Sequence, residues 1–379
     1  MNESGEKQIP LSGSDITEKE KQAVLNVLGS PYLSLGPRLP EFEEKMSSYI
    51  GTKHAVAVNS GTSALHLIVR ALGITAGDEV ITTPFSFIAS ANCILFENAR
   101  PVFADIDKLT LNIDPDLIEG AVTEKTKAIL AVDVFGHPAE WDKLKRIAKK
   151  HGLKLIEDSC EAIGAEYKGR KAGTFGAAGT FAFYPNKQIT TGEGGMIVTD
   201  DGEIAEFCES SRNQGRNMGS AWLSHERLGY NYRLSDINCA LGTCQLGRIS
   251  EILGKRDHVA EVYGNLLKDV EEIELPYVSE DVKMSWFVYV VRLKEKFTEI
   301  QRNDIIKRLK HSGIGCSNYF APIHLQPFYV KMFGYQKGDY PVTESVSERT
   351  IALPFYSNLK DADIARVVRI LKEIIADVS

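Results

Sequence analysis

Lys187 is the first residue of this sequence whose surroundings suggest chemistry. In "TFAFYPNKQITTGEGG" it follows an apolar, strand-like run and precedes a glycine-rich turn. We expect this turn to hold the lysine inside the fold rather than let it extend into solvent. A lysine in a tight, partly desolvated turn has a lowered proton affinity and can attack an aldehyde to form a Schiff base. The structural alternative, an exposed loop lysine, stays open on this stretch alone.

Two adjacent acids, Glu157 and Asp158, end the apolar run of "LIEDSCEAIGA". A carboxylate at a buried strand end is costly unless it meets a cation or several hydrogen-bond donors. A protonated pyridine nitrogen would be such a partner, and this contact is what lets pyridoxal phosphate (PLP) act as an electron sink. The structural alternative is an acid that caps the following helix.

Two further stretches suit the same cofactor. Ser60, Gly61 and Thr62 lie in "NSGTSALHL", between a strand and a helix, where free N–H groups and the helix dipole favour a phosphate. An ordinary helix cap is the alternative there. Phe87, in "TPFSFIAS", could stack on a flat heteroaromatic ring, although a lone phenylalanine also suits a core. Together, the phosphate cradle, the stacking aromatic, the acid and the lysine each match one group of PLP.

Alternating strands and helices are expected to position these residues. A capping box "TEKE" starts a helix at Thr17 that ends before Gly29. Short β-branched or aromatic runs then alternate with helical patterns, which indicates an α/β fold with a largely parallel sheet covered by helices on both faces. The candidate residues follow the strands, at the carboxyl ends where such sheets bind ligands. Strand, turn and helix are expected in "HAVAVNSGTSALHLIVRALG" and again in "DEVITTPFSFIASANCILF". Further strand-like runs are "RPVFADID", "KAILAVDVFG", "LKLIEDSC", "GTFAFYP" and "GMIVTDD".

The length of 379 residues favours one large and one smaller domain. We place the large cofactor-binding domain at 1–250, with the N-terminal segment free to pack elsewhere, and a small C-terminal α+β domain at 251–379. The net charge of −7 and the lack of a basic run argue against nucleic-acid binding and favour a small-molecule partner.

The cellular location is predicted from the cysteines and the apolar runs. The six cysteines form neither a CxxC pair nor a metal-ligand spacing, so no metal is expected, and a reducing compartment fits them. The polar N-terminus and the lack of a long apolar run predict a cytoplasmic protein with no membrane segment.

The ordered set of motifs resembles the DegT/StrS group of nucleotide-sugar aminotransferases, PLP-dependent enzymes of fold type I. The resemblance extends over nearly the whole chain. It rests on "SLGPRLPEFEEKM", "NSGTSAL", "GDEVITTPFSFIASAN", "PVFADID", "IEDSCEAIGAEYKGRKAGTFG", "FYPNKQITTGEGGMIVTDD", "LGYNYRLSDINCALG" and "PIHLQPFY".

The resemblance implies roles for particular residues. Lys187 would form the internal aldimine, Asp158 would pair with the pyridine nitrogen, and Phe87 would stack on the ring. Gly61 and Thr62 would hold the phosphate.

The chain departs from the family pattern at two positions. Glu161 stands where the family usually has a glutamine that contacts the cofactor ring or its phenolic oxygen. Ala182 replaces a phosphate-binding serine, so Thr180 or another donor would substitute for it.

Three more residues are assigned by the resemblance. Asn231, in "GYNYRLSD", would reach the phosphate of a neighbouring subunit, which implies an obligate homodimer with two composite sites. Tyr184 and His324 would lie on the substrate side. A packed loop histidine is the structural alternative for His324.

The activity implied is ping-pong transamination. An amino acid, expected to be L-glutamate, would leave its nitrogen on the cofactor, and a nucleotide-linked 3- or 4-keto-6-deoxy sugar would collect it for amino-sugar or polysaccharide biosynthesis. The alternatives are a keto-inositol aminotransferase and a non-enzymatic regulator on the same scaffold. A related sugar dehydratase would have histidine in place of Lys187.

Overall fold

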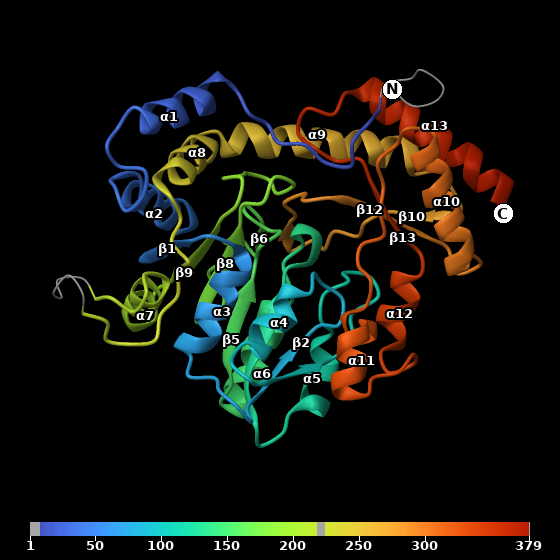
Figure 1. The fold of residues 1–379 in the computed structure, drawn as a ribbon. Coiled ribbons are helices and arrows are strands. Elements are labelled where there is room, and N and C mark those ends of the chain that lie inside the picture. The colour runs from blue at the N-terminus through green and yellow to red at the C-terminus, as the bar shows by residue number, and fades with distance from the viewer. Residues whose placement is uncertain (1–7, 218–223, 379) are drawn as a thin grey trace.

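The computed structural model describes residues 8–217 and 224–378. Its centre is a seven-stranded sheet in the order β1-β9-β8-β5-β4-β2-β3 (Figure 1). Strand β9 is antiparallel to both of its neighbours, whereas the pairs that join β8, β5, β4, β2 and β3 are all parallel, as the sequence predicts. The strands are β1 His54–Val58, β2 Glu79–Thr82, β3 Arg100–Phe103, β4 Thr126–Val132, β5 Lys154–Asp158, β8 Ala178–Ala182 and β9 Gly195–Thr199.

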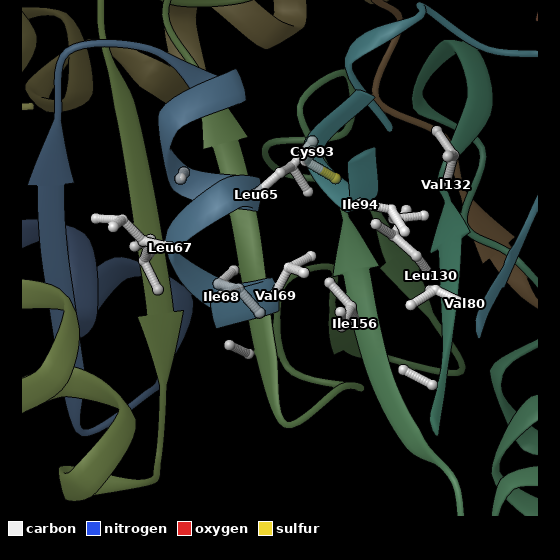
Figure 2. Packing of buried hydrophobic residues seen from close by; sticks show 14 of the residues in the cluster. Leu65, Leu67, Ile68, Val69, Val80, Cys93, Ile94, Leu130, Val132 and Ile156 are labelled. Carbon is white, nitrogen blue, oxygen red and sulfur yellow. The ribbon is translucent and has the colours of Figure 1, made fainter. Parts of the chain in front are cut away.

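Helices cover both faces of this sheet, since successive strand residues point to opposite faces. Leu130 and Val132 pack in one hydrophobic cluster with α3 and α4, whereas Ile129 and Ala131 pack in another with α6. Figure 2 shows the first cluster, in which side chains of α3 and α4 lie over the sheet. The helices up to residue 247 are α1 Glu18–Leu28, α2 Arg38–Ile50, α3 Gly61–Ala71, α4 Ala89–Leu95, α5 Pro115–Ala121, α6 Trp141–His151, α7 Gly202–Arg212 and α8 Asp236–Gly247.

The predicted N-terminal helix is confirmed as α1. Thr17 is its N-cap and forms a capping box with Glu20, and Gly29 is the C-cap. Because the Thr17 hydroxyl and the Glu20 carboxylate satisfy backbone groups at the helix start, four residues of sequence are enough to fix where this helix begins.

The C-terminal part is built on a three-stranded antiparallel sheet in the order β10-β12-β13. Its long helix α9 extends from the end of α8 to this sheet (Figure 1). The predicted domain boundary at residue 250 falls in the first turn of α9. Ile9 pairs with Ile314 and belongs to the hydrophobic cluster of this part, so the start of the described chain packs here.

The remaining elements are short apart from the helices of the C-terminal part. They are β6 Glu166–Tyr167, β7 Arg170–Lys171, α9 Ile249–Leu267, β10 Ile273–Glu274, β11 Val282–Lys283, β12 Tyr289–Leu293, α10 Glu299–His311, α11 Pro327–Phe333, α12 Pro341–Ser347, β13 Thr350–Leu353 and α13 Asp361–Val378. Within the described residues, no helix is long and apolar enough to span a membrane.

Candidate active site

A cavity of about 490 Å³ lies at the carboxyl ends of the central strands. Val132, Asp158 and Ala182, the last residues of β4, β5 and β8, all line it. Ligands of parallel α/β sheets bind at this edge, because the loops that follow the strands converge there. The lining residues are Ser60, Gly61, Thr62, Leu65, Ser86, Phe87, Ala89, Ser90, Val132, Asp158, Cys160, Glu161, Ala182, Tyr184, Asn186, Lys187, Glu193, Gly194, Phe287, Asn318, Tyr319 and Phe320.

Lys187 lies in the turn after β8 and faces this cavity. Its backbone N–H donates to the carbonyl of Tyr184 at 2.9 Å, which closes the turn. Its side chain is only 12% exposed, and its Nζ lies 3.4 Å from Glu161 Oε1. The same nitrogen lies 3.9 Å from the ring centroid of Phe287. The lysine is therefore held inside the fold, between a carboxylate and an aromatic ring.

Asp158, rather than Glu157, reaches the cavity, because neighbouring strand residues point in opposite directions. Asp158 Oδ2 accepts a hydrogen bond from Ser90 Oγ at 2.7 Å, and Oδ1 accepts one from the backbone N–H of Cys160 at 3.2 Å. Glu157 instead accepts backbone N–H groups from the segment that leads to β8, including that of Phe175 at 2.7 Å. The buried Asp158 carboxylate is thus supported by donors on one side and open to the cavity on another.

Glu161 is buried and lies beside Lys187. Its Oε2 accepts a hydrogen bond from the backbone N–H of Phe135 at 3.0 Å. Burial raises the pKa of the Glu161 carboxyl, and the nearby Lys187 ammonium and the Phe135 N–H oppose that rise. This site therefore places a second ionisable carboxyl within reach of the lysine nitrogen.

The start of α3 forms one wall of the cavity through Ser60, Gly61 and Thr62. Ser60 is the N-cap and accepts from the backbone N–H of Ser63 at 3.1 Å, so the ordinary capping alternative also holds. The first N–H groups of a helix have no partner within the helix and carry the positive end of its dipole. A Cβ on Gly61 would meet Ala182 Cβ and Cys160 Sγ, each at 2.8 Å, so glycine is what lets this helix start pack against the strand ends.

Phe87 and Tyr184 present large aromatic surfaces at the cavity. Phe87 is 60% exposed just before α4, and Tyr184 is 52% exposed after β8. A core role for Phe87, the alternative considered above, does not fit this exposure. An exposed aromatic ring on a cavity wall is available to stack on a ligand ring.

Three of the predicted site residues do not line this cavity. Thr180 pairs with Asp158 in the sheet but is fully buried, and Ala182, two residues later, forms the wall instead. His324 is buried with its Nε2 3.0 Å from Glu344 Oε1, which matches the packed-loop alternative. Asn231 is exposed, forms an isolated bridge with Asn213 and does not line the cavity of its own chain.

Several residues at the site were not predicted from the sequence. Ser86 and Ser90 form a hydroxyl pair 2.9 Å apart that leads to Asp158. Phe287 reaches the cavity from just before β12, and Tyr319 and Phe320 reach it from the C-terminal part. Their spacing in the sequence does not predict these residues, because they come to the cavity from segments about a hundred residues or more away from Lys187.

The arrangement fits PLP. A helix N-terminus suits its phosphate, the supported carboxylate of Asp158 suits a protonated ring nitrogen, and Lys187 suits its aldehyde. Cavities of several hundred cubic ångströms are the usual size for cofactor sites. Over the described residues, no group of three or more His, Cys, Asp or Glu side chains could hold a metal ion.

Comparisons with known proteins agree with this assignment. Residues 14–372 match the model of the DegT/DnrJ/EryC1/StrS aminotransferase family. The GDP-perosamine synthase of Caulobacter vibrioides is 36% identical over 97% of this chain and 98% of its own length.

Two solved structures are also similar along nearly all of the chain. PseC of Helicobacter pylori, an aminotransferase involved in the biosynthesis of pseudoaminic acid, has a TM-score of 0.94 and 32% identity over 98% of this chain and 100% of its own. The PLP form of the sugar aminotransferase Spr1654 of Streptococcus pneumoniae, described as putative, has a TM-score of 0.93 and 30% identity over 98% of this chain and 100% of its own. The chain belongs to the DegT/DnrJ/EryC1/StrS aminotransferase family and is a PLP-dependent transaminase of fold type I.

Proposed function

We propose that this transaminase moves an amino group from L-glutamate to a nucleotide-linked 3- or 4-keto-6-deoxy sugar in a ping-pong reaction, giving an amino sugar for polysaccharide or glycan synthesis. Relatives named for a GDP-linked amino sugar and for pseudoaminic acid biosynthesis support the substrate class. The observation that carries the proposal is the placement of Lys187 and Asp158 on the wall of one cavity with the start of α3.

When bound, PLP supplies an aldehyde carbon that accepts amino groups and a ring that takes up the electron pair left on the substrate carbon. Gly61 and Thr62 bind the phosphate through the helix start, and Phe87 stacks on the ring. Asp158 holds a proton on the ring nitrogen through one of its carboxylate oxygens. Ser90 orients that carboxylate by its hydrogen bond to Oδ2.

Lys187 is assigned two tasks at its Nζ atom. With PLP bound, Nζ would hold the cofactor at its aldehyde carbon, with loss of water. The free amine would take a proton from the substrate carbon and return it at the aldehyde carbon of the cofactor. Glu161 lies 3.4 Å from this nitrogen and keeps it in the cavity. Tyr184, half exposed on the wall, contacts the sugar substrate.

A homodimer with shared sites is part of the proposal. Asn231 is exposed and does not line the cavity of its own chain, which suits a residue that reaches the phosphate site of a second subunit. Thr180 is buried and does not line the cavity, so the phosphate contact that Ala182 cannot make is assigned to the backbone of α3 and to Asn231. His324 is also buried away from the cavity wall and is given no substrate contact.

The experiment is an absorbance titration of the purified full-length chain with PLP, followed by L-glutamate and then by a panel of keto substrates. We expect a lysine-bound absorbance band that glutamate converts to the pyridoxamine phosphate spectrum. A nucleotide-linked keto sugar should then restore the first band.

Restoration by a keto-inositol but by no nucleotide sugar would assign the second substrate to the alternative class. If the chain never takes up PLP, the enzymatic assignment fails and a regulatory role replaces it.

A further inference from the structure

The amino group of Lys187 lies between two groups that come from different parts of the fold. On one side, Glu161 Oε1 is 3.4 Å from Nζ and belongs to the loop after β5. On the other, the ring of Phe287 has its centroid 3.9 Å from the same nitrogen and belongs to the C-terminal part, just before β12. A carboxylate and the face of an aromatic ring both attract an ammonium group, and the attraction grows where water is excluded.

A buried arginine, Arg256, fixes the backbone at Phe287. Arg256 of α9 is fully buried, and its guanidinium donates to the carbonyls of Trp286 at 2.7 Å and Phe287 at 2.8 Å. The same guanidinium donates to the hydroxyl of Ser357 at 3.4 Å and lies over the ring of Phe355, so this buried cation holds the backbone at Phe287 in place.

Gln188, the residue after Lys187, links the same three segments. Its Nε2 donates to the carbonyl of Glu161 at 2.6 Å and to the carbonyl of Ser285 at 3.1 Å. One buried amide therefore ties the lysine turn, the loop of Glu161 and the segment that carries Phe287 to one another. Displacement of any one of these segments would move the others.

We propose that Phe287 and Glu161 form a receiving site for the free amino group of Lys187, with Arg256 and Gln188 as positioning residues. This inference rests on the proposed role of Lys187. While the lysine nitrogen is not bonded to the cofactor, its flexible four-carbon side chain could swing away from the carbon where the proton is moved. The receiving site keeps Nζ in the cavity, between the carboxylate and the ring, until it is needed.

Other ionisable groups surround this position. Asp158 raises the pKa of Glu161 by its charge, whereas the Lys187 ammonium lowers it. Tyr319 faces Glu161 from the C-terminal part, and burial raises the pKa of its hydroxyl. On the cavity wall, the Lys187 nitrogen is thus accompanied by the carboxyl groups of Glu161 and Asp158. The rings of Phe287, Tyr319 and Tyr184 line the same wall.

The test measures how fast Lys187 reacts, not how fast the enzyme turns over. The full-length chain, loaded with pyridoxamine phosphate and in parallel without cofactor, is methylated with formaldehyde and a borane reductant at fixed pH. Mass spectrometry of the Lys187 peptide gives the rate constant. The amine nitrogen must reach formaldehyde to react, so a site that holds Nζ against a carboxylate and a ring protects the lysine.

We expect Phe287→Leu to raise the methylation rate of Lys187 by about threefold to tenfold, in line with the usual strength of a cation–π contact. Phe287→Tyr, which keeps the ring, should stay within about twofold of wild type. Glu161→Gln should raise the rate independently. Leu65→Ala, which widens the same cavity without touching Lys187, controls for reagent access and should leave the rate unchanged.

The inference is overturned if neither Phe287→Leu nor Glu161→Gln changes the rate, or if Leu65→Ala raises it as much as they do. Thermal melts verify that each variant is folded. The absorbance change with glutamate is recorded separately, so a chain that protects Lys187 but never transaminates would retain the receiving site and lose the proposed function.

Discussion

Ser90 Oγ donates a 2.7 Å hydrogen bond to Asp158 Oδ2, and the Oγ atoms of Ser86 and Ser90 lie 2.9 Å apart. Ser86 lies just before α4 and Ser90 in its first turn, whereas Asp158 ends β5. All three side chains are buried at the cavity. The acid that is proposed to hold the ring-nitrogen proton is therefore oriented by the start of α4 as well as by the backbone N–H of Cys160, just after its own strand.

Ser90→Ala should slow transamination without abolishing cofactor binding. A hydrogen bond to a charged group contributes about 1.5–3 kcal/mol, and loss of about 1.4 kcal/mol in the transition state lowers a rate tenfold. We expect kcat to fall by about tenfold or more while the KM for glutamate changes little. Ser86→Ala, one hydroxyl further away, is the matched control and should have a smaller effect. Equal kcat values for wild type and Ser90→Ala would contradict this role.

Asp158→Asn should impair chemistry more than it impairs PLP binding. The amide cannot hold a proton on the ring nitrogen by charge, so the electron pair of the substrate carbon is stabilised less. We expect the half-reaction with glutamate to slow by roughly a hundredfold or more, which corresponds to about 2.7 kcal/mol. Stopped-flow absorbance and a PLP titration measure the two effects. If the rate of the half-reaction and the affinity for PLP fell by the same factor, Asp158 would have a structural role instead.

Gly61→Ala should weaken PLP binding. Its Cβ would lie 2.8 Å from both Ala182 Cβ and Cys160 Sγ, so the start of α3 must shift away from the strand ends. Gly120→Ala in α5 is the matched control, because a Cβ there has nothing within 4 Å. We expect the PLP dissociation constant to rise by about tenfold for Gly61→Ala, a change of about 1.4 kcal/mol, and not for Gly120→Ala. The same constant for both variants would place the phosphate elsewhere.

Two buried carboxyl groups, those of Asp133 and Glu157, should make the free energy of unfolding depend on pH. Asp133 and Glu157 are fully buried and share the hydroxyl of Ser159, at 2.7 Å and 3.0 Å. Burial raises the pKa of both carboxyl groups. The unfolded chain then loses these protons at lower pH than the folded chain does, so this contribution to stability is present below about pH 4 and is lost as the pH rises through the folded pKa values.

Asp133→Asn removes one titrating group and keeps an acceptor for the backbone N–H of Ala139 and for Trp141 Nε1. Relative to this variant, wild type should lose stability as the pH rises from about 4 to 8. Urea unfolding at several pH values, with the two proteins side by side, measures the difference. A difference in unfolding free energy that is constant with pH would show that Asp133 does not titrate in this range.

The sequence predicted the sheet and the strand-end position of the site, because continuous apolar runs and helix caps are local signals. Thr17 and Glu20 determine the start of α1 within four residues, and the apolar runs mark each central strand. Local patterns also placed Lys187, Asp158 and Gly61 where strands end.

The contacts between these residues could not be predicted in the same way. Phe287 meets Lys187 because the segment before β12 folds back to the cavity wall, and Ser90 meets Asp158 because α4 begins near the end of β5. Thr180 and His324 illustrate the opposite case. Both were predicted to lie at the site, but tertiary packing buries Thr180 within β8 of the sheet and pairs His324 with Glu344.

The most direct test of the central assignment is borohydride trapping of the chain with PLP, followed by mass mapping of every lysine peptide. Lys168→Ala, a half-exposed lysine outside the cavity, is the control for Lys187→Ala. We expect one phosphopyridoxyl group per chain, on Lys187, in wild type and Lys168→Ala, and none in Lys187→Ala. Modification that leaves Lys187 unlabelled in wild type, or that persists at the same level in Lys187→Ala, would contradict it.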